Sequence, residues 1–134
     1  MSRKQIINPG WARYQRLTYS PAVRKGNLLF ISGQSGAEQD PATGKLVVKG
    51  DIVAQTRIAY EKIKTILEAA GASMADVVKT VDYITPAGLE NYRATAEVRR
   101  QYFKDGFPAA TGVVVNRLLR EGALIEIEAI AVVD

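Results

Sequence analysis

The spacing of apolar residues along the chain predicts two amphipathic helices. Between positions 52 and 70, apolar side chains recur at steps of three, four or seven residues, which places them on one face of a helix. Asp51 is a suitable N-cap for this helix, and Gly71 stands where a glycine commonly ends one. Thr85 followed by Pro86 predicts the start of a second helix, which extends to about Phe103.

The remaining segments have the β-branched residues or the alternation that is typical of strands. Two short apolar runs flank Lys25-Gly26-Asn27, which predicts a tight hairpin whose second strand is closed by Gly33. Residues 40–44 are a cluster of turn-forming residues that precedes a short edge strand. The expected strands are residues 22–24, 28–32, 46–48, 77–84, 110–118 and 123–133.

This order of elements predicts a single α+β domain over residues 1–134. Two helices are enough to cover one face of a mixed sheet, and they leave the other face open. A partner subunit is the simplest way to bury that second face, so we expect an oligomer. The last strand favours this interpretation, because both of its faces are largely apolar although one carries Glu126 and Glu128.

The absence of cysteine and histidine narrows the possible chemistry. It excludes disulfides, thiol nucleophiles, zinc sites built on these ligands, and a Ser-His-Asp triad. Acid–base catalysis would therefore rely on Asp, Glu, Lys, Tyr or water. We expect neither a metal nor a cofactor.

The charge and the apolar runs limit the kinds of partner. A net charge of +4 is compatible with an anionic ligand, but the 18 Lys and Arg residues are scattered, which argues against nucleic acid. No apolar run has the length of a membrane span or of a signal peptide core. We therefore expect a cytoplasmic protein that does not contact membranes.

Glu126 and Glu128 are the first candidates for catalytic residues. They are two positions apart on a predicted strand, so they share a face and their Cα atoms lie roughly 6.5–7 Å apart. Carboxylates in an apolar strand tend to be desolvated, which raises their pKa toward the range of a general acid or base. Alternatively, they are structural carboxylates that bind arginine or backbone amides at a subunit interface.

Two other segments also allow a functional and a structural interpretation. Ser32-Gly33-Gln34-Ser35-Gly36 follows a strand, and its backbone either holds an anion or forms a bent strand end. The aromatic residues between positions 11 and 19 surround Arg13 and Arg16. They either stack on a planar ligand or pack the N-terminal segment onto the sheet.

A series of short motifs resembles one family in order along the chain. The similarity is clearest from about Val23 to Val133 and weaker from Tyr19, and the chain is identified as a member of the YjgF-like family, also called the Rid family of enamine/imine deaminases. The motifs are YSPAV at 19–23, FISGQ at 30–34, Gln55, LEAAG at 67–71, DVVK at 76–79, FPA at 107–109 and IEIEAIA at 125–131.

The resemblance implies a chorismate-mutase-like fold, in which two helices pack on one face of a mixed sheet, and a homotrimer with clefts between neighbouring subunits. In active members a glutamate of the last strand orients the attacking water, which implies this role for Glu126. A tyrosine and a strand end complete the cleft, and they correspond to Tyr19 and to Ser32-Gly33. We expect the Thr111-Gly112 backbone to donate hydrogen bonds and Glu128 to support the site.

One residue of the family pattern is missing. Active members have an arginine directly after Phe-Pro-Ala that clamps a substrate carboxylate, and this chain has Ala110 at that position. Arg99, Arg16 or Arg117 are the candidates for a replacement cation. Arg99 stands where the family has an aromatic residue, and it is either solvated or directed into the cleft.

Two further departures accompany the missing arginine. An asparagine of the family pattern is absent at Ala96, and the hairpin at residues 119–122 is one residue longer than usual.

The sequence therefore predicts a small-molecule enzyme that deaminates or tautomerises an enamine, an imine or a related reactive metabolite. Its specificity is expected to be altered because of Ala110. The alternative is a non-catalytic trimer that binds a metabolite. An RNA-directed activity is a third hypothesis, which the scattered basic residues support poorly.

Overall fold

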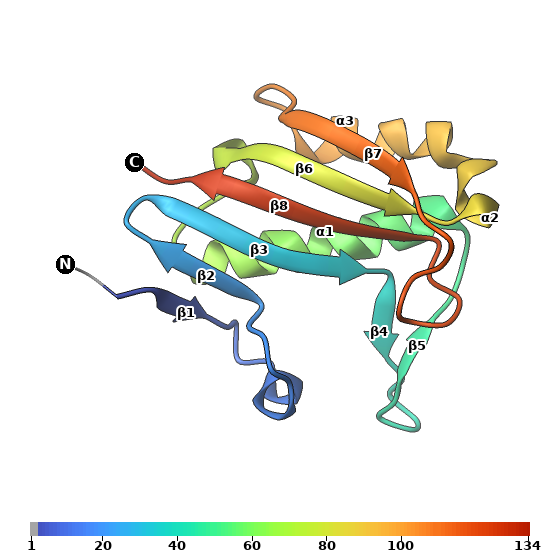
Figure 1. Cartoon of the computed structure of the whole chain (residues 1–134), viewed down its shortest axis with the longest axis horizontal. Helices are drawn as coiled ribbons and strands as arrows, with labels where there is room; N and C mark the ends of the chain where they lie inside the picture. The colour runs from blue at the N-terminus through green and yellow to red at the C-terminus, as the bar shows by residue number, and fades with distance from the viewer. Residues whose placement is uncertain (1–2) are drawn as a thin grey trace.

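The structure is a computed structural model that describes residues 3–134. Its main feature is a six-stranded mixed sheet in which only β6 and β7 are parallel neighbours (Figure 1). A hairpin of two short strands, β4 (Ala37–Gln39) and β5 (Leu46–Val48), stands apart from it. The order in the main sheet is β1 (Gln5–Ile7), β2 (Ala22–Lys25), β3 (Leu28–Ser35), β8 (Ile125–Val132), β6 (Val77–Ile84) and β7 (Ala109–Val114).

The long helix α1 (Ile52–Ala69) forms as the sequence predicts. Asp51 Oδ1 accepts a hydrogen bond from Ala54 N at 2.9 Å, and Gly71 has the positive φ of +74° that suits the residue after a helix. The apolar stripe of α1 is buried against β3 and β8, where it forms the centre of the core.

The second predicted helix is broken into three pieces. They are α2 (Pro86–Leu89), the 3₁₀ segment η3 (Tyr92–Thr95) and α3 (Ala96–Tyr102). Thr85 caps α2 through Gly88 N, but the Thr95 hydroxyl donates to Tyr92 O at 2.6 Å. The interruption that precedes this bond lies at Asn91, whose φ of −116° and ψ of 17° depart from helical values.

The strands differ from the prediction mainly at their ends. Gly33 does not end β3, which continues to Ser35 with an irregular register between Ile31 and Gln34. β7 ends at Val114 rather than 118, and β8 begins at Ile125 rather than 123. Four short elements were not predicted from the sequence: β1, β4, η1 (Ala12–Arg16) and η2 (Met74–Asp76).

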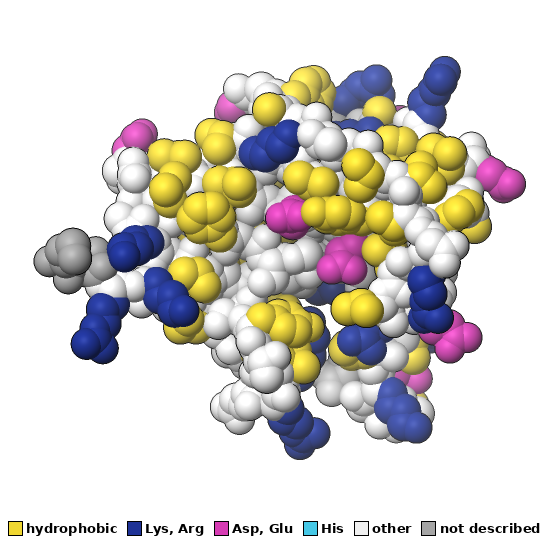
Figure 2. Space-filling model, viewed as in Figure 1, with side chains coloured by type: hydrophobic (Ala, Val, Ile, Leu, Met, Phe, Trp, Pro, Cys, Tyr) yellow, Lys and Arg dark blue, Asp and Glu magenta, His cyan; other side chains and the backbone are white. Residues whose placement is uncertain are grey.

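The two faces of the sheet are different, as the element order predicts. Helices lie behind one face, which buries alternate residues of β8 such as Ile127 and Ala129. Opposite them, Glu126, Glu128 and the exposed Phe30 belong to a face that no element within residues 3–134 covers. Figure 2 shows this open face, with two acidic side chains among apolar ones. Within residues 3–134, no helix combines the length and the hydropathy needed to cross a membrane.

Candidate functional site

Glu126 lies on β8 next to a gap that a glycine leaves on the neighbouring strand. A Cβ atom added at Gly33 would overlap Glu126 Oε1 and would lie 3.0 Å from Glu126 Cδ. The carboxyl group therefore occupies the space that the side chain of any larger residue at position 33 would need. The irregular register of β3 between Ile31 and Gln34 accompanies this arrangement. Sequence-predicted Gly33 and Glu126 are thus brought into contact.

A pocket of about 210 Å³ opens beside this carboxyl group, and Tyr19 and Gly33 line it together with Glu126. Figure 2 shows the hollow below the sheet, between η1 and the β4–β5 hairpin, with basic side chains around it. We call it the Glu126 pocket. A larger groove of about 760 Å³ lies between η1, the same hairpin and α1, and contains none of the predicted site residues. Lys62 is one of the residues that line both.

The Glu126 pocket contains three cations from three different elements. Arg13 comes from η1, Lys62 from α1 and Arg120 from the loop that joins β7 to β8. The Lys62 ammonium donates a hydrogen bond to Ala37 O at 2.9 Å. None of these cations was a predicted site residue, and the three predicted replacements, Arg99, Arg16 and Arg117, are not among the residues that line the pocket.

Burial shifts the pKa values of the acid and of the lysine in this pocket. Burial raises the pKa of Glu126, and nearby Lys62 and Arg120 partly oppose that shift. The pKa of Lys62 is lowered to about 8, first by burial and then by the charges of Arg13 and Arg120. Glu126 and Glu38 act in the opposite direction on Lys62. Both groups therefore carry a charge that their surroundings disfavour.

The N-terminal aromatic residues form one wall of the pocket. Tyr14 is buried, and its hydroxyl accepts hydrogen bonds from Gln34 Nε2 at 3.3 Å and from Arg13 Nη2 at 3.4 Å. The Arg13 guanidinium also lies 4.5 Å from the centre of the Tyr14 ring. Tyr19 packs edge-on against Tyr14 and stays 55% exposed. The segment thus packs on the sheet and also contributes Tyr14 and Tyr19 to the lining of the pocket.

The backbone that follows Ile31 is used mainly for packing. The Ser32 hydroxyl donates to Ser20 O at 2.6 Å, and Ser32 O accepts from Gln34 Nε2 at 3.1 Å. A Cβ atom at Gly36 would lie 2.7 Å from the Cα of Gln55, so Gly36 permits the close approach of α1. These contacts agree with the bent strand end, and Ser32 itself does not line the Glu126 pocket.

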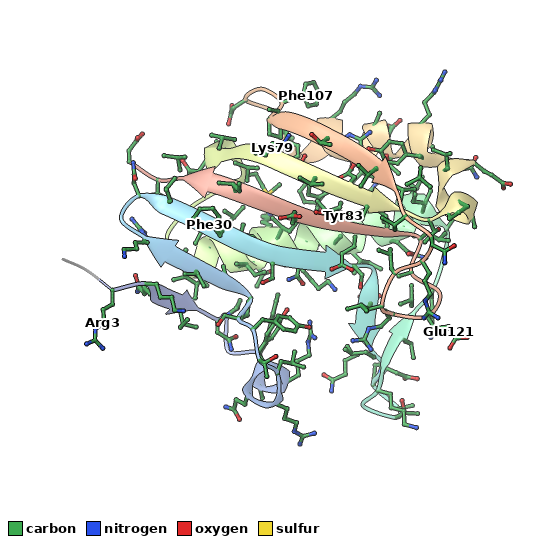
Figure 3. The ribbon with its side chains drawn as sticks, viewed as in Figure 1. Arg3, Phe30, Lys79, Tyr83, Phe107 and Glu121 are labelled. Carbon is green, nitrogen blue, oxygen red and sulfur yellow. The ribbon has the colours of Figure 1, made fainter. Side chains whose placement is uncertain are left out.

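Glu128 lies farther along the open face and has a partner of its own. The Tyr83 hydroxyl donates to Glu128 Oε1, and this bond is the first cause of the raised pKa of Tyr83. Tyr83 pairs with Glu126 in the register of β6 and β8, and Figure 3 shows it near the middle of the open face. Thr111 lies at the β7 edge, where its hydroxyl accepts from Lys79 Nζ at 2.7 Å.

The other β7 positions lie on the opposite side of the sheet. Ala110 and Gly112 pair with the buried residues Thr80 and Asp82, so their side-chain directions are toward the helices. A Cβ atom at Gly112 would be 3.4 Å from the Tyr92 hydroxyl. Within one protomer, Ala110 and Gly112 therefore do not reach the Glu126 pocket.

Arg99 lies on this helix side and is neither freely solvated nor directed into the Glu126 pocket. Its Nη1 is 3.6 Å from Asp82 Oδ2 and donates to Thr95 Oγ1 at 2.8 Å, while its guanidinium lies over the Tyr92 ring. Arg16 is exposed at the end of η1, and the exposed Arg117 donates to Leu118 O. Within one protomer, none of the three is placed to replace a clamp opposite Glu126.

Two of the cations that sequence reasoning missed have a signal in the sequence. Gln55, Ala59, Lys62 and Ile66 are spaced at four, three and four residues, so Lys62 continues a buried row of α1. A lysine in such a row must direct its ammonium to a polar site. Arg120 lies in the loop at 119–122, where the resemblance to the family predicts one residue more than usual.

Comparison with known proteins now defines the family. The family described as Endoribonuclease L-PSP matches residues 12–133. A RutC family protein of Pyrococcus horikoshii is 48% identical over 113 residues, which cover 84% of this chain and 85% of that protein. The 2-iminobutanoate/2-iminopropanoate deaminase of Homo sapiens is 38% identical over 114 residues, which cover 85% of this chain and 79% of that protein.

The solved structures agree with this assignment. The crystal structure of E. coli TdcF with bound serine resembles the chain with a TM-score of 0.79 at 33% identity, and the match covers 97% of this chain and 99% of TdcF. The chain belongs to the Endoribonuclease L-PSP family, the YjgF-like or Rid family that its motifs resemble. The predicted family and the predicted α+β fold class are thus confirmed.

Proposed function

We propose that the chain is a cytoplasmic, homotrimeric enzyme that deaminates or tautomerises an enamine or imine in a cleft between subunits. The observation that carries the proposal is the Glu126 carboxyl group, which lies half-buried over Gly33 in a pocket that Tyr19 also lines. Its raised pKa suits a group that must take up and return a proton near neutral pH. The open face of the sheet provides the surface for the other subunits.

In hydrolysis, water adds to the carbon of a protonated C=N bond and transfers one proton to Glu126. The carbinolamine then takes that proton on nitrogen and loses ammonia, which leaves as ammonium with the hydroxyl proton and yields a carbonyl product. In tautomerisation, the same carboxyl group would move a proton between nitrogen and the β-carbon. The cleft would be completed by Ala110, Thr111 and Gly112 from β7 of a neighbouring protomer. Glu128, on the open face, would support the site.

The names of the relatives support this class of reaction. The human relative is named for its action on 2-iminobutanoate and 2-iminopropanoate, and TdcF was solved with serine bound. The resemblance implies an arginine in active members at the position where this chain has Ala110, so we propose an altered specificity relative to such enzymes.

The test is turnover of imines generated by an amino-acid oxidase, with acidic, neutral and aromatic examples. Glu126→Gln is expected to lower the rate by about 10²–10⁴-fold, as loss of a general acid or base does. Glu121→Gln is the matched control, because Glu121 is exposed in the β7–β8 loop (Figure 3). Equal rates for wild type and Glu126→Gln would refute the proposal.

The second candidate function is that of a trimer that binds a metabolite without converting it. The alanine at position 110 favours this candidate, because it cannot clamp a substrate carboxylate as an arginine would. Stabilisation by a metabolite without any turnover across the imine panel would select this candidate. A ligand at 100 times its Kd should stabilise the folded protein by about 2.7 kcal/mol, which a thermal melt detects.

A further inference from the structure

The Glu126 pocket has more positive than negative charge. Arg13, Lys62 and Arg120 line it with a single carboxyl group, Glu126. The cations come from elements that are far apart in the sequence, so the fold and not a local motif gathers them. An enclosed space with an excess of two positive charges attracts anions.

These cations are not neutralised by the protein itself. Among residues 3–134, the ion pair within 4.0 Å joins Arg99 to Asp82, and none of the three pocket cations takes part in one. Lys62 and Arg120 are nevertheless close enough to Glu126 to influence its pKa. The pocket is therefore lined by an acid and two nearby cations that form no ion pair with it.

Lys62 and Arg120 differ from Arg13 in the contacts that they make within the chain. Arg13 is held against Tyr14 by ring stacking and a hydrogen bond, so it forms a fixed wall. The Lys62 ammonium has one acceptor, Ala37 O, and two further N–H groups that can bind a ligand. Arg120 is exposed on a loop, where its planar guanidinium can turn to an incoming group.

We infer that Lys62 and Arg120 bind the carboxylate of the substrate in the Glu126 pocket, on the same protomer as the acid. They would replace the arginine that position 110 lacks. Lys62 has a physical reason to do so, because a partly buried ammonium is costly without a counter-ion and a bound carboxylate supplies one. The inference rests on the proposed function for the identity of the reacting group, and it names Lys62 and Arg120 as specificity-determining residues.

Binding of 2-oxobutanoate and of its amide, 2-oxobutanamide, tests this assignment by calorimetry on the full chain. The two probes have nearly the same shape and differ in charge. Wild type is expected to prefer the carboxylate by about tenfold or more, the range for hydrogen bonds to a charged group. Lys62→Met and Arg120→Met should each remove most of that preference and leave amide binding unchanged. Arg120→Met is a loop substitution, so it tests the inference even where a change at Lys62 affects folding.

Lys64→Met and Arg100→Met are the matched controls, because both side chains are exposed and neither lines the Glu126 pocket. For turnover of an acidic imine, the pocket variants should raise KM about tenfold and change kcat less than twofold. An undiminished carboxylate preference in both pocket variants, or no preference in wild type, overturns the inference.

These measurements distinguish a failure of the proposed reaction from a failure of the proposed carboxylate site. Glu126→Gln should lower turnover by about 10²–10⁴-fold and keep the carboxylate preference. Turnover of neutral imines alone would sustain the proposed function and refute the role of Lys62 and Arg120. Loss of the preference in Lys62→Met, in a protein that turns over no imine, would keep the anion site and refute the reaction.

Discussion

Asp82 and Glu126 are carboxyl groups on the neighbouring strands β6 and β8, and they have similar shifts in pKa but different partners. Burial raises the pKa of both, and each has arginine or lysine nearby. Asp82 faces the helices and is 3% exposed, with Tyr92 donating to it at 2.6 Å and Arg99 3.6 Å away. Glu126 faces the open side, where no cation comes within ion-pair distance in residues 3–134.

The hydrogen-bond and ion-pair partners of a carboxyl group, and not the direction of its pKa shift, therefore distinguish a structural acid from a candidate catalytic one. Arg99 contacts Asp82 and Thr95, so this cluster connects η3 and α3 to the sheet. Lys62 has only a backbone carbonyl as its acceptor, and its charge remains available. The ion pair and the hydrogen bond of Asp82 both lie within the chain, although its buried Oδ1 has no hydrogen-bond partner among residues 3–134, whereas the Glu126 pocket is left open for a ligand.

The largest effect on stability is expected at the Asp82 cluster. Arg99→Met leaves Asp82 buried with Tyr92 as its remaining partner, and should lower the free energy of unfolding by about 2–4 kcal/mol. Lys62→Met removes a partly buried, unpaired cation, so it should change stability by less than about 1 kcal/mol or increase it. Denaturant unfolding of both variants measures the contrast. A larger loss for Lys62→Met than for Arg99→Met would reverse the distinction.

Gly33→Ala tests how tightly the open acid is seated. The added methyl group collides with the Glu126 carboxyl, so we expect a loss of about 1–3 kcal/mol together with impaired activity. In a Glu126→Ala background the obstruction is gone, and the same substitution should have little effect on stability. Unfolding of the four proteins forms a double-mutant cycle. Additive effects would show that Gly33 is needed for another reason.

Local signals explain why most of the fold can be predicted from the sequence. Asp51 and Gly71 mark the ends of α1, and β-branched residues mark β6. The broken second helix could not be predicted, because Asn91, where the backbone leaves helical values, is not by its residue type a strong helix breaker. A three-residue strand such as β1 depends on pairing with β2 rather than on its own pattern.

The candidate site was predictable only where one strand carries the signal. Glu126 and Glu128 follow from alternation along β8, but only tertiary structure shows that Glu128 has Tyr83 as its partner. The side of the sheet on which Ala110 lies depends on its register with Thr80, which no single segment encodes. Arg120 reaches the pocket through a loop, and loop conformation leaves no periodic pattern.

The pH dependence should expose both ionisations of the open site. Glu126 must be charged to accept a proton, and since its pKa is raised, activity should decline on acidification already above the ordinary Glu value of about 4.3. Lys62 must be charged to hold a carboxylate, and its pKa of about 8 means that affinity falls as the pH rises through that value. Titrating 2-oxobutanoate affinity from pH 6 to 10 should reveal about a tenfold loss, in keeping with one charged hydrogen bond.

Lys62→Arg is the control for this titration. A guanidinium stays protonated up to a pKa above about 12, so the alkaline decline should disappear in this variant while the carboxylate preference remains. A decline near pH 8 that persists in both Lys62→Arg and Lys62→Met would assign the ionisation to another group.

The smallest effect is expected from Tyr83→Phe, which separates the Glu126 pocket from the rest of the open face. The substitution removes one hydrogen bond, to Glu128, so the free energy of unfolding should change by about 1 kcal/mol or less. Binding of 2-oxobutanoate, measured by calorimetry, should stay within twofold of wild type. A tenfold change would mean that the ligand extends along β8 to Glu128. The ligand site would then contain two carboxyl groups, Glu126 and Glu128, instead of Glu126 alone.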